Sequence, residues 1–306
     1  MKLTPILVSL SALLAAPGLS MAQSMPMPPT TSAAAGDVGQ VDDIEVVGRL
    51  SPRQRAESFV AEVGAAPGEA RLARWDRSLC VGAGAMERDQ AQRLIDRVSI
   101  VAASLGLQLG APGCKANVMI MATTTADALA QDMVRSDPNG FQPAFGNSDA
   151  GNAELERFQR SDAAVRWWQV SLPVSADTGQ VAIRMKGDDE PPSISSPSMS
   201  RLRGGVRDDL ARIYIIVDTT KLGDVSFDAL CDYIAMISLA QINDRADTTR
   251  YDTILNLFKN SPVNSRLSQW DFAYLKYLYE ADRSLAHRDA QMLEIASRLG
   301  RSTATP

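Results

Sequence analysis

The sequence predicts an α/β protein in which a mixed β-sheet is combined with a buried central helix and a mostly helical C-terminal part. Three observations support this fold class. Short β-prone runs alternate with helical periodicity between residues 79 and 134. A long apolar helix follows at residues 226–243, and helical patterns dominate from there on. Strands that alternate with helices are typical of parallel strands joined by crossover helices.

The first elements follow from hydrophobic spacing. Apolar residues recur at helical intervals from Met86 to Leu105, and Gly106 then supplies a left-handed stop. The expected order is a strand at 79–81, a helix at 86–105, a strand at 116–122, a helix at 126–134 and a loop at 138–152.

The second half of the chain begins with two β-rich runs around a glycine-containing turn, which is typical of a hairpin. The expected elements are strands at 165–174 and 180–185, a loop at 186–200, a strand at 213–217, the helix at 226–243, a turn at 253–256 and helices at 268–281 and 289–299. The helix at 226–243 is apolar on nearly every side, so we expect it in the core, with Ser226 as its N-cap.

The chain starts with a predicted secretory signal. Lys2 gives a positive n-region, residues 6–16 give an apolar h-region, and small residues up to Ala22 suit a signal peptidase. The apolar run is shorter than the roughly 20 residues of a membrane span, and no later stretch qualifies. We expect an exported, periplasmic protein that is cleaved near Ala22 and has no transmembrane segment afterwards.

Residues 23–50 are rich in Pro, Ser, Thr, Ala and Gly and are predicted to be a flexible linker. Within it, residues 41–49 (VDDIEVVGR) resemble the TonB box of TonB-dependent outer-membrane receptors. Such a box binds by adding a strand to a partner's sheet, so Asp42 to Arg49 is a candidate strand donor toward an envelope protein or peptide. The alternative is a short edge strand or tether. A single domain is expected at 51–300, with a disordered tail at 301–306.

Charge and motif content exclude several functions. The chain has 31 basic and 36 acidic residues, which argues against nucleic acid as a partner because phosphate contacts need a basic surface. No glycine-rich phosphate loop, serine nucleophile elbow or CxxC pair is present, so no cofactor is predicted.

Three cysteines are present, and an exported protein matures where thiols oxidise. Cys80 and Cys114 flank the helix at 86–105 and are predicted to form a disulfide. Cys231 is then left over. Without a nearby histidine or other base it is expected to pack in the core as an inert thiol.

The order of elements resembles the zincin fold of zinc metalloproteases, its metzincin-like branch and their uncharacterised periplasmic relatives. In that family a strand leads into a metal helix with the motif H-E-x-x-H-x-x-G, a turn follows, and a helix with L-T-x-x-D and L-x-x-L-Y packs beside it. Residues 213–218, 253–255, 267–271 (LSQWD) and 275–279 (LKYLY) stand at these places. The likeness covers residues 72–279 in element order and 213–279 in motifs.

The metal motif itself is missing. When the family motif is laid on the helix, Cys231, Asp232, Ala235 and Ser238 occupy the first His, the Glu, the second His and the Gly. Zinc catalysis needs three protein ligands and an open position, and the chain's single histidine, His287, lies elsewhere. The resemblance therefore implies a pseudoenzyme scaffold with no metal site.

Candidate site residues remain for two other classes of function. Cys231, Asp232 and Asp271 are weak catalytic candidates. Asp232 needs a partner on such an apolar helix, so the alternatives are a loop cap or an ion pair with an arginine among residues 201–207. Arg201, Arg203 and Arg207 surround a Gly-Gly turn and, with Trp168, are candidate ligand-binding residues for an anion or peptide terminus; a solvated basic loop is the alternative.

The sequence thus predicts a non-catalytic exported protein that acts by protein or peptide binding in the cell envelope. The alternative is a hydrolase or peptidase with a non-standard site that uses Asp232 and Cys231. A third hypothesis is a small-ligand or peptide-binding module centred on Arg201, Arg203 and Trp168.

Overall fold

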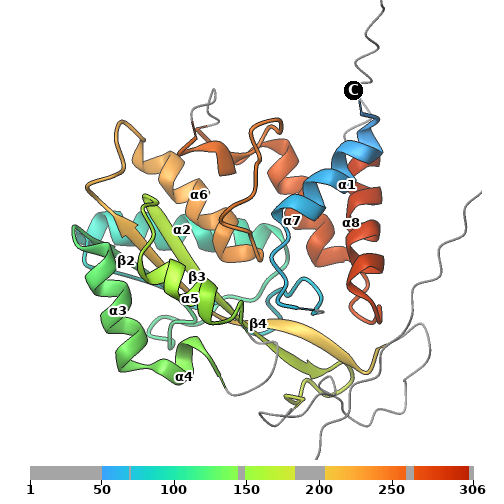
Figure 1. The fold of residues 1–306 in the computed structure, drawn as a ribbon, viewed down its shortest axis with the longest axis horizontal. Coiled ribbons are helices and arrows are strands. Elements are labelled where there is room, and N and C mark those ends of the chain that lie inside the picture. Colours follow the sequence, from blue (N-terminus) through green and yellow to red (C-terminus); the bar gives the residue numbers. More distant parts are fainter. Residues whose placement is uncertain (1–49, 69, 144–148, 183–203, 260–264, 303–306) are drawn as a thin grey trace, which may run out of the picture. The chain divides into compact units, whose positions relative to one another are not determined.

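The computed structural model describes residues 50–68, 70–143, 149–182, 204–259 and 265–302, all of which belong to one compact unit. Four strands form one mixed sheet in the order β1-β2-β4-β3; β2, β4 and β3 are labelled in Figure 1. The strands are β1 Val81–Gly84, β2 Val118–Thr123, β3 Val165–Ser175 and β4 Val206–Asp218. β1, β2 and β4 run parallel, and β3 pairs antiparallel with β4 at the edge. The predicted mixed sheet of an α/β fold is confirmed.

Helices cover both faces of this sheet (Figure 1). The larger core lies between one face and α2, α6, α7, α1 and α8, and a smaller cluster lies between the other face and α3, α4 and α5. The helices are α1 Pro52–Val63, α2 Arg88–Ser104, α3 Ala126–Ser136, α4 Pro138–Phe141, α5 Asn152–Gln159, α6 Phe227–Leu239, α7 Gln269–Glu280 and α8 Arg288–Ser302, with a 3-10 turn η1 at Ile254–Asn256.

The predicted central helix is α6, and it is buried along its whole length after the first turn. Ser226 caps it by accepting a hydrogen bond from the Ala229 N–H at 3.2 Å. It ends at Leu239, earlier than expected, because residues 241–243 leave the helix and pair with the end of α1. Ile242 forms an antiparallel bridge with Gly64.

Three helices lie outside the predicted pattern. α1 was not predicted, although Ser51 and Gln54 form a capping box at its start. The loop expected at 138–152 contains α4, which begins after the N-cap Asp137, and α5 begins at its end. α8 continues to Ser302, so the tail expected at 301–306 is helical in its first two residues.

The predicted hairpin is only partly correct. β3 turns through residues 176–179 as expected, and Val174 bridges Val181 in antiparallel fashion. The main partner of β3 is nevertheless β4, which begins at Val206, seven residues before the strand expected at 213–217. Residues 183–203 lie outside the described part of the chain.

The predicted disulfide between Cys80 and Cys114 is present, with the two Cα atoms 6.1 Å apart. It ties the start of β1 to the loop before β2. Cys231 is a free, buried thiol, as expected.

Candidate functional site

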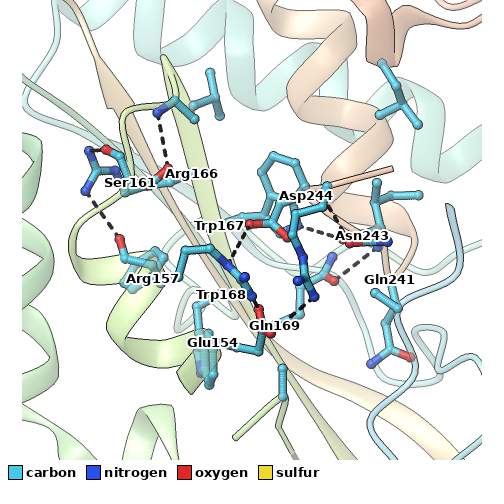
Figure 2. A pocket seen from close by; sticks show the side chains of 18 of the residues that line it. Glu154, Arg157, Ser161, Arg166, Trp167, Trp168, Gln169, Gln241, Asn243 and Asp244 are labelled. Atoms are coloured by element: carbon cyan, nitrogen blue, oxygen red, sulfur yellow. Dashed lines mark hydrogen bonds and ion pairs between the residues drawn. The ribbon is translucent and has the colours of Figure 1, made fainter. Parts of the chain in front are cut away.

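A cleft of about 900 Å³ lies beyond the free edge of β3 (Figure 2). Consecutive residues from Ala163 to Gln169 line it. Neighbouring side chains on a strand point to opposite faces of the sheet, so all of them can line one cavity only if that cavity lies beyond the strand's edge. The opposite walls come from residues 64–68, from α5 and from residues 241–245.

The backbone of β3 offers unpaired groups to this cleft. The Asp218 N–H donates to the Ala164 carbonyl at 2.9 Å, which identifies a hydrogen-bonded pair of the antiparallel ladder. Since such pairs alternate, Val165, Trp167 and Gln169 turn their N–H and C=O groups away from β4. Among the described residues, none of these groups has a hydrogen bond outside the ladder. The edge is therefore available for another strand.

The far half of the same edge is covered. The Ala182 N–H donates to the Pro173 carbonyl at 2.8 Å, and the Ser175 N–H donates to the Gln180 carbonyl at 2.7 Å. Pro173 has no N–H to offer a neighbour, as is typical of edge strands. The open segment is thus limited to the part of β3 that lines the cleft.

Hydrogen exchange checks this assignment. The amide protons of Val165, Trp167 and Gln169 should exchange at least about 100-fold faster than those of Arg166 and Trp168, because only the latter are held in the ladder. Residue-resolved exchange by NMR measures the alternation. Equal protection of all five amides would mean that the edge is covered in solution.

An aromatic cluster forms the wall of the cleft next to α6. The Tyr233 ring lies 6.2 Å from Trp167 and 5.2 Å from Phe258, both in edge-on geometry. Trp167 and Phe258 are half-buried, and Tyr233 is 7% exposed. Burial raises the pKa of Tyr233, and its hydroxyl donates to no residue in the described ranges. The wall is therefore apolar, with one unused hydrogen-bond donor.

Side chains of β3 hold the loop after α6 in place at the cleft. The Trp167 Nε1 donates to the Ile242 carbonyl at 3.0 Å. The Gln169 amide accepts from the Ile242 N–H at 3.2 Å and donates to the Ala240 carbonyl at 2.6 Å. In Figure 2 the side chains of Trp167 and Gln169 lie next to the loop that carries Asn243 and Asp244. This wall is preformed by hydrogen bonds.

The charges of the cleft are unequal. Its cationic side chains are Arg157, Arg166, Lys221, Arg245 and Lys259. Its carboxylates are those of Glu154, Asp162 and Asp244, so cations exceed carboxylates by two. Asp127 and Asp218, which do not line the cleft, pair with Arg166 and Lys221, so these two cations each have a carboxylate partner.

The predicted catalytic candidates do not line this cleft. Cys231 and Asp232 lie on the side of α6 that faces α2. Burial raises the pKa of the Cys231 thiol to about 11, so it is not a thiolate at neutral pH. Asp232 pairs with Arg97 of α2 and accepts from the Leu267 N–H at 2.9 Å. It does have an arginine partner, but that partner is not among residues 201–207.

Asp232 should therefore matter for stability. Asp232→Ala leaves the Arg97 guanidinium and the Leu267 N–H without their acceptor, and we expect a loss of about 2–4 kcal/mol of unfolding free energy. Asp228→Ala on the same helix removes an exposed pair with Arg93 and should cost below about 1 kcal/mol. Urea titration of both variants measures the difference. Equal losses would contradict the structural role.

The third candidate, Asp271, is the buried third residue of α7, where it forms a capping box with the N-cap Ser268. It accepts from the Thr253 hydroxyl, from the Ile254 N–H at 2.8 Å and from the Ser268 N–H at 2.9 Å. Burial raises its pKa to about 6, and these hydrogen bonds act in the opposite direction. Every contact is to the protein itself, so the residue connects η1 to α7.

The predicted ligand-binding set can be followed only at Arg207 and Trp168. Arg201 and Arg203 lie outside the described residues. Arg207 is paired with Asp209 at 3.0 Å and with Asp76 at 2.5 Å. Trp168 is 3% exposed and packs in the smaller core, where strand alternation directs it, and it is also among the residues that line the cleft. The strand-donor segment 41–49 is also outside the described residues.

Two other features are absent from the described residues. No three His, Cys, Asp or Glu residues are grouped so that they could hold a metal ion. No helix there is long and apolar enough to cross a membrane.

Comparison with known proteins gives no match: no family model, no curated protein and no solved structure is similar to this chain.

Proposed function

We propose that this protein is a non-catalytic, exported binding protein that captures an extended peptide segment of an envelope partner at the free edge of β3. The observation that carries the proposal is the row of unpaired backbone groups at Val165, Trp167 and Gln169, which opens into the cleft. A peptide added to a sheet edge gains main-chain hydrogen bonds there, while pockets on either side select its side chains.

The arrangement around the cleft supports binding rather than hydrolysis. None of Cys231, Asp232 and Asp271 lines it, and each is engaged by or buried in the protein. A general base must lie within hydrogen-bond reach of the proton that it takes up. The hydrolase alternative that uses Asp232 and Cys231 has no such group at the cleft.

The degenerate zincin-like scaffold is part of the proposal. β4 leads into the buried α6, and η1 and α7 follow, which is the order that the resemblance requires. A motif register two residues later places the last motif position at the end of α6. It puts Tyr233, Ile234 and Ile237 at the first His, the Glu and the second His, and Ala240, the first residue after the helix, at the Gly. Tyr233 then faces the cleft as a metal ligand would, although a phenol among isoleucines makes no zinc site.

The test uses a neutral probe peptide, acetylated and amidated, with the sequence Thr-Asn-Ile-Asn-Ile-Asn-Ile-Thr. Its binding should protect the Val165, Trp167 and Gln169 amides from exchange by about 10-fold or more at saturation. A version of the peptide that is N-methylated at alternate residues keeps its side chains but loses the N–H groups that would face β3. It should therefore not protect the β3 amides from exchange. Binding of both versions without protection of these amides would contradict strand addition.

A further inference from the structure

The two faces of β3 differ in chemistry, and a strand added to its edge would sample both. Residues of the added strand that lie directly opposite Trp167 carry their side chains on the same face as Trp167. The residues between them point to the other face. The cleft can therefore select a two-residue alternation in its partner.

The face next to α6 is apolar at the cleft. Trp167, Tyr233 and Phe258 make edge-on ring contacts there, and the buried Leu255 lines the same cavity. Trp167 and Phe258 keep part of their surface exposed, so an incoming aliphatic or aromatic side chain would remove apolar area from water.

The face next to α5 carries two arginines, Arg166 and Arg157, each with an unused buried donor. The Arg166 side chain is only 2% exposed, and its Nε atom is buried without a hydrogen-bond partner in the described structure. Its other nitrogens donate to Asp127 at 2.6 Å and to the carbonyls of Phe158 and Ser161. Arg157 on α5 lines the same wall, where it is paired with Glu154 and its Nε atom lies 3.7 Å from an Asp244 carboxylate oxygen (Figure 2). A buried guanidinium with an unused donor favours an acceptor from the partner.

We propose that the partner is an extended segment in which apolar residues alternate with acidic residues. The apolar side chains face Trp167, Tyr233 and Phe258, and the carboxylates face Arg166 and Arg157. The buried Nε atoms of Arg166 and Arg157, which have no hydrogen-bond partner in the described structure, are the charged donors that such carboxylates would reach. This inference rests on strand addition at β3, and it adds the chemical class of the ligand.

The first experiment compares four acetylated and amidated peptides by isothermal titration and by protection of the β3 amides. The acidic probe, Thr-Asp-Ile-Asp-Ile-Asp-Ile-Thr, should bind roughly 5- to 50-fold more tightly than the neutral probe with Asn at the three Asp positions, and its advantage should shrink at high salt. A lysine version should bind most weakly. An acidic version with Ser at the Ile positions should lose at least about 10-fold, since the apolar contacts are gone.

The outcomes separate this inference from the function on which it rests. If the acidic, neutral and lysine peptides bind equally and all protect the β3 amides, strand addition stands and the acidic alternation is overturned. If none of the peptides protects these amides, both are overturned. If the neutral peptide protects them and the acidic peptide does not, strand addition stands and the inference is overturned. Tighter binding of the lysine version would reverse the charge assignment and overturn the inference.

Matched variants locate the charge effect at the α5 wall. Arg157→Gln should weaken the acidic probe about 3-fold or more relative to the neutral probe, whereas Glu154→Gln should strengthen it. Arg135→Gln on α3, whose side chain is 73% exposed and outside the cleft, should change neither. Loss of affinity for both probes in both cleft variants would indicate general damage to the wall and would contradict the charge selection.

Discussion

Replacement of Asp271 by alanine is expected to remove about 3–5 kcal/mol of unfolding free energy without changing peptide binding to the folded protein. The carboxylate accepts from Thr253, Ile254 and Ser268, and it is fully buried. Without it, several buried donors lose their acceptor, each at a cost of roughly 1–3 kcal/mol before the structure relaxes. The connection between η1 and α7 would be the first part of the core to loosen.

The same carboxyl gives the stability a defined pH dependence. Folding raises the Asp271 pKa from 3.8 to about 6, so the folded state binds its proton more tightly than the unfolded state does. Stability from this group is therefore fully present below about pH 4 and declines as the pH rises to about 6, by up to roughly 3 kcal/mol. Since alanine does not titrate, the gap between wild type and Asp271→Ala should narrow over this window and stay constant above about pH 7.

Urea unfolding of both proteins between pH 4 and pH 8 measures that gap. Asp289→Ala is the control, because this residue also lies in the first turn of a helix but is exposed, and it should leave the profile unchanged. A gap that widens as the pH rises would show that the hydrogen bonds outweigh burial and that the folded pKa lies below 3.8.

The elements that the sequence predicted well are those whose pattern reports burial directly. The apolar run at 226–243 could only be a core helix, and the alternation of strands and helices before residue 134 required parallel pairing of β1 with β2. α1 was missed because its charged residues hide a buried stripe at Ala56, Phe59, Val60 and Val63. The capping box at Ser51 and Gln54 was the local signal that identifies its start.

The binding cleft was harder to predict because an edge is a long-range property. Whether β3 has a free side depends on β4, which follows only after residues 183–203. Pro173 was the available hint that this strand lies at an edge. No such signal shows which side of α6 faces the cleft. Because the helix is apolar all round, its sequence does not reveal that Tyr233 faces the cleft while Asp232 faces α2.

Removal of the disulfide is expected to destabilise the protein by about 4 kcal/mol. Cys80 and Cys114 are 34 residues apart, and closing a loop of that length in the unfolded chain accounts for an effect of this size in the chain-entropy model. Cys80 is buried at the start of β1, so its loss also loosens the strand at the end of the sheet opposite β3. The β3 cleft, which lies at the other edge, should keep its peptide affinity under folding conditions.

The variant Cys80→Ser with Cys114→Ser tests this by urea titration with and without a reducing agent. Reduction should lower the midpoint of the wild type to that of the double variant and should not affect the double variant itself, because Cys231 is buried and unpaired. An equal midpoint for the two oxidised proteins would mean that the bridge contributes no stability. The bridge forms only where thiols oxidise. A large loss of stability without it would therefore make folding dependent on export to an oxidising compartment, where the proposed function also places the protein.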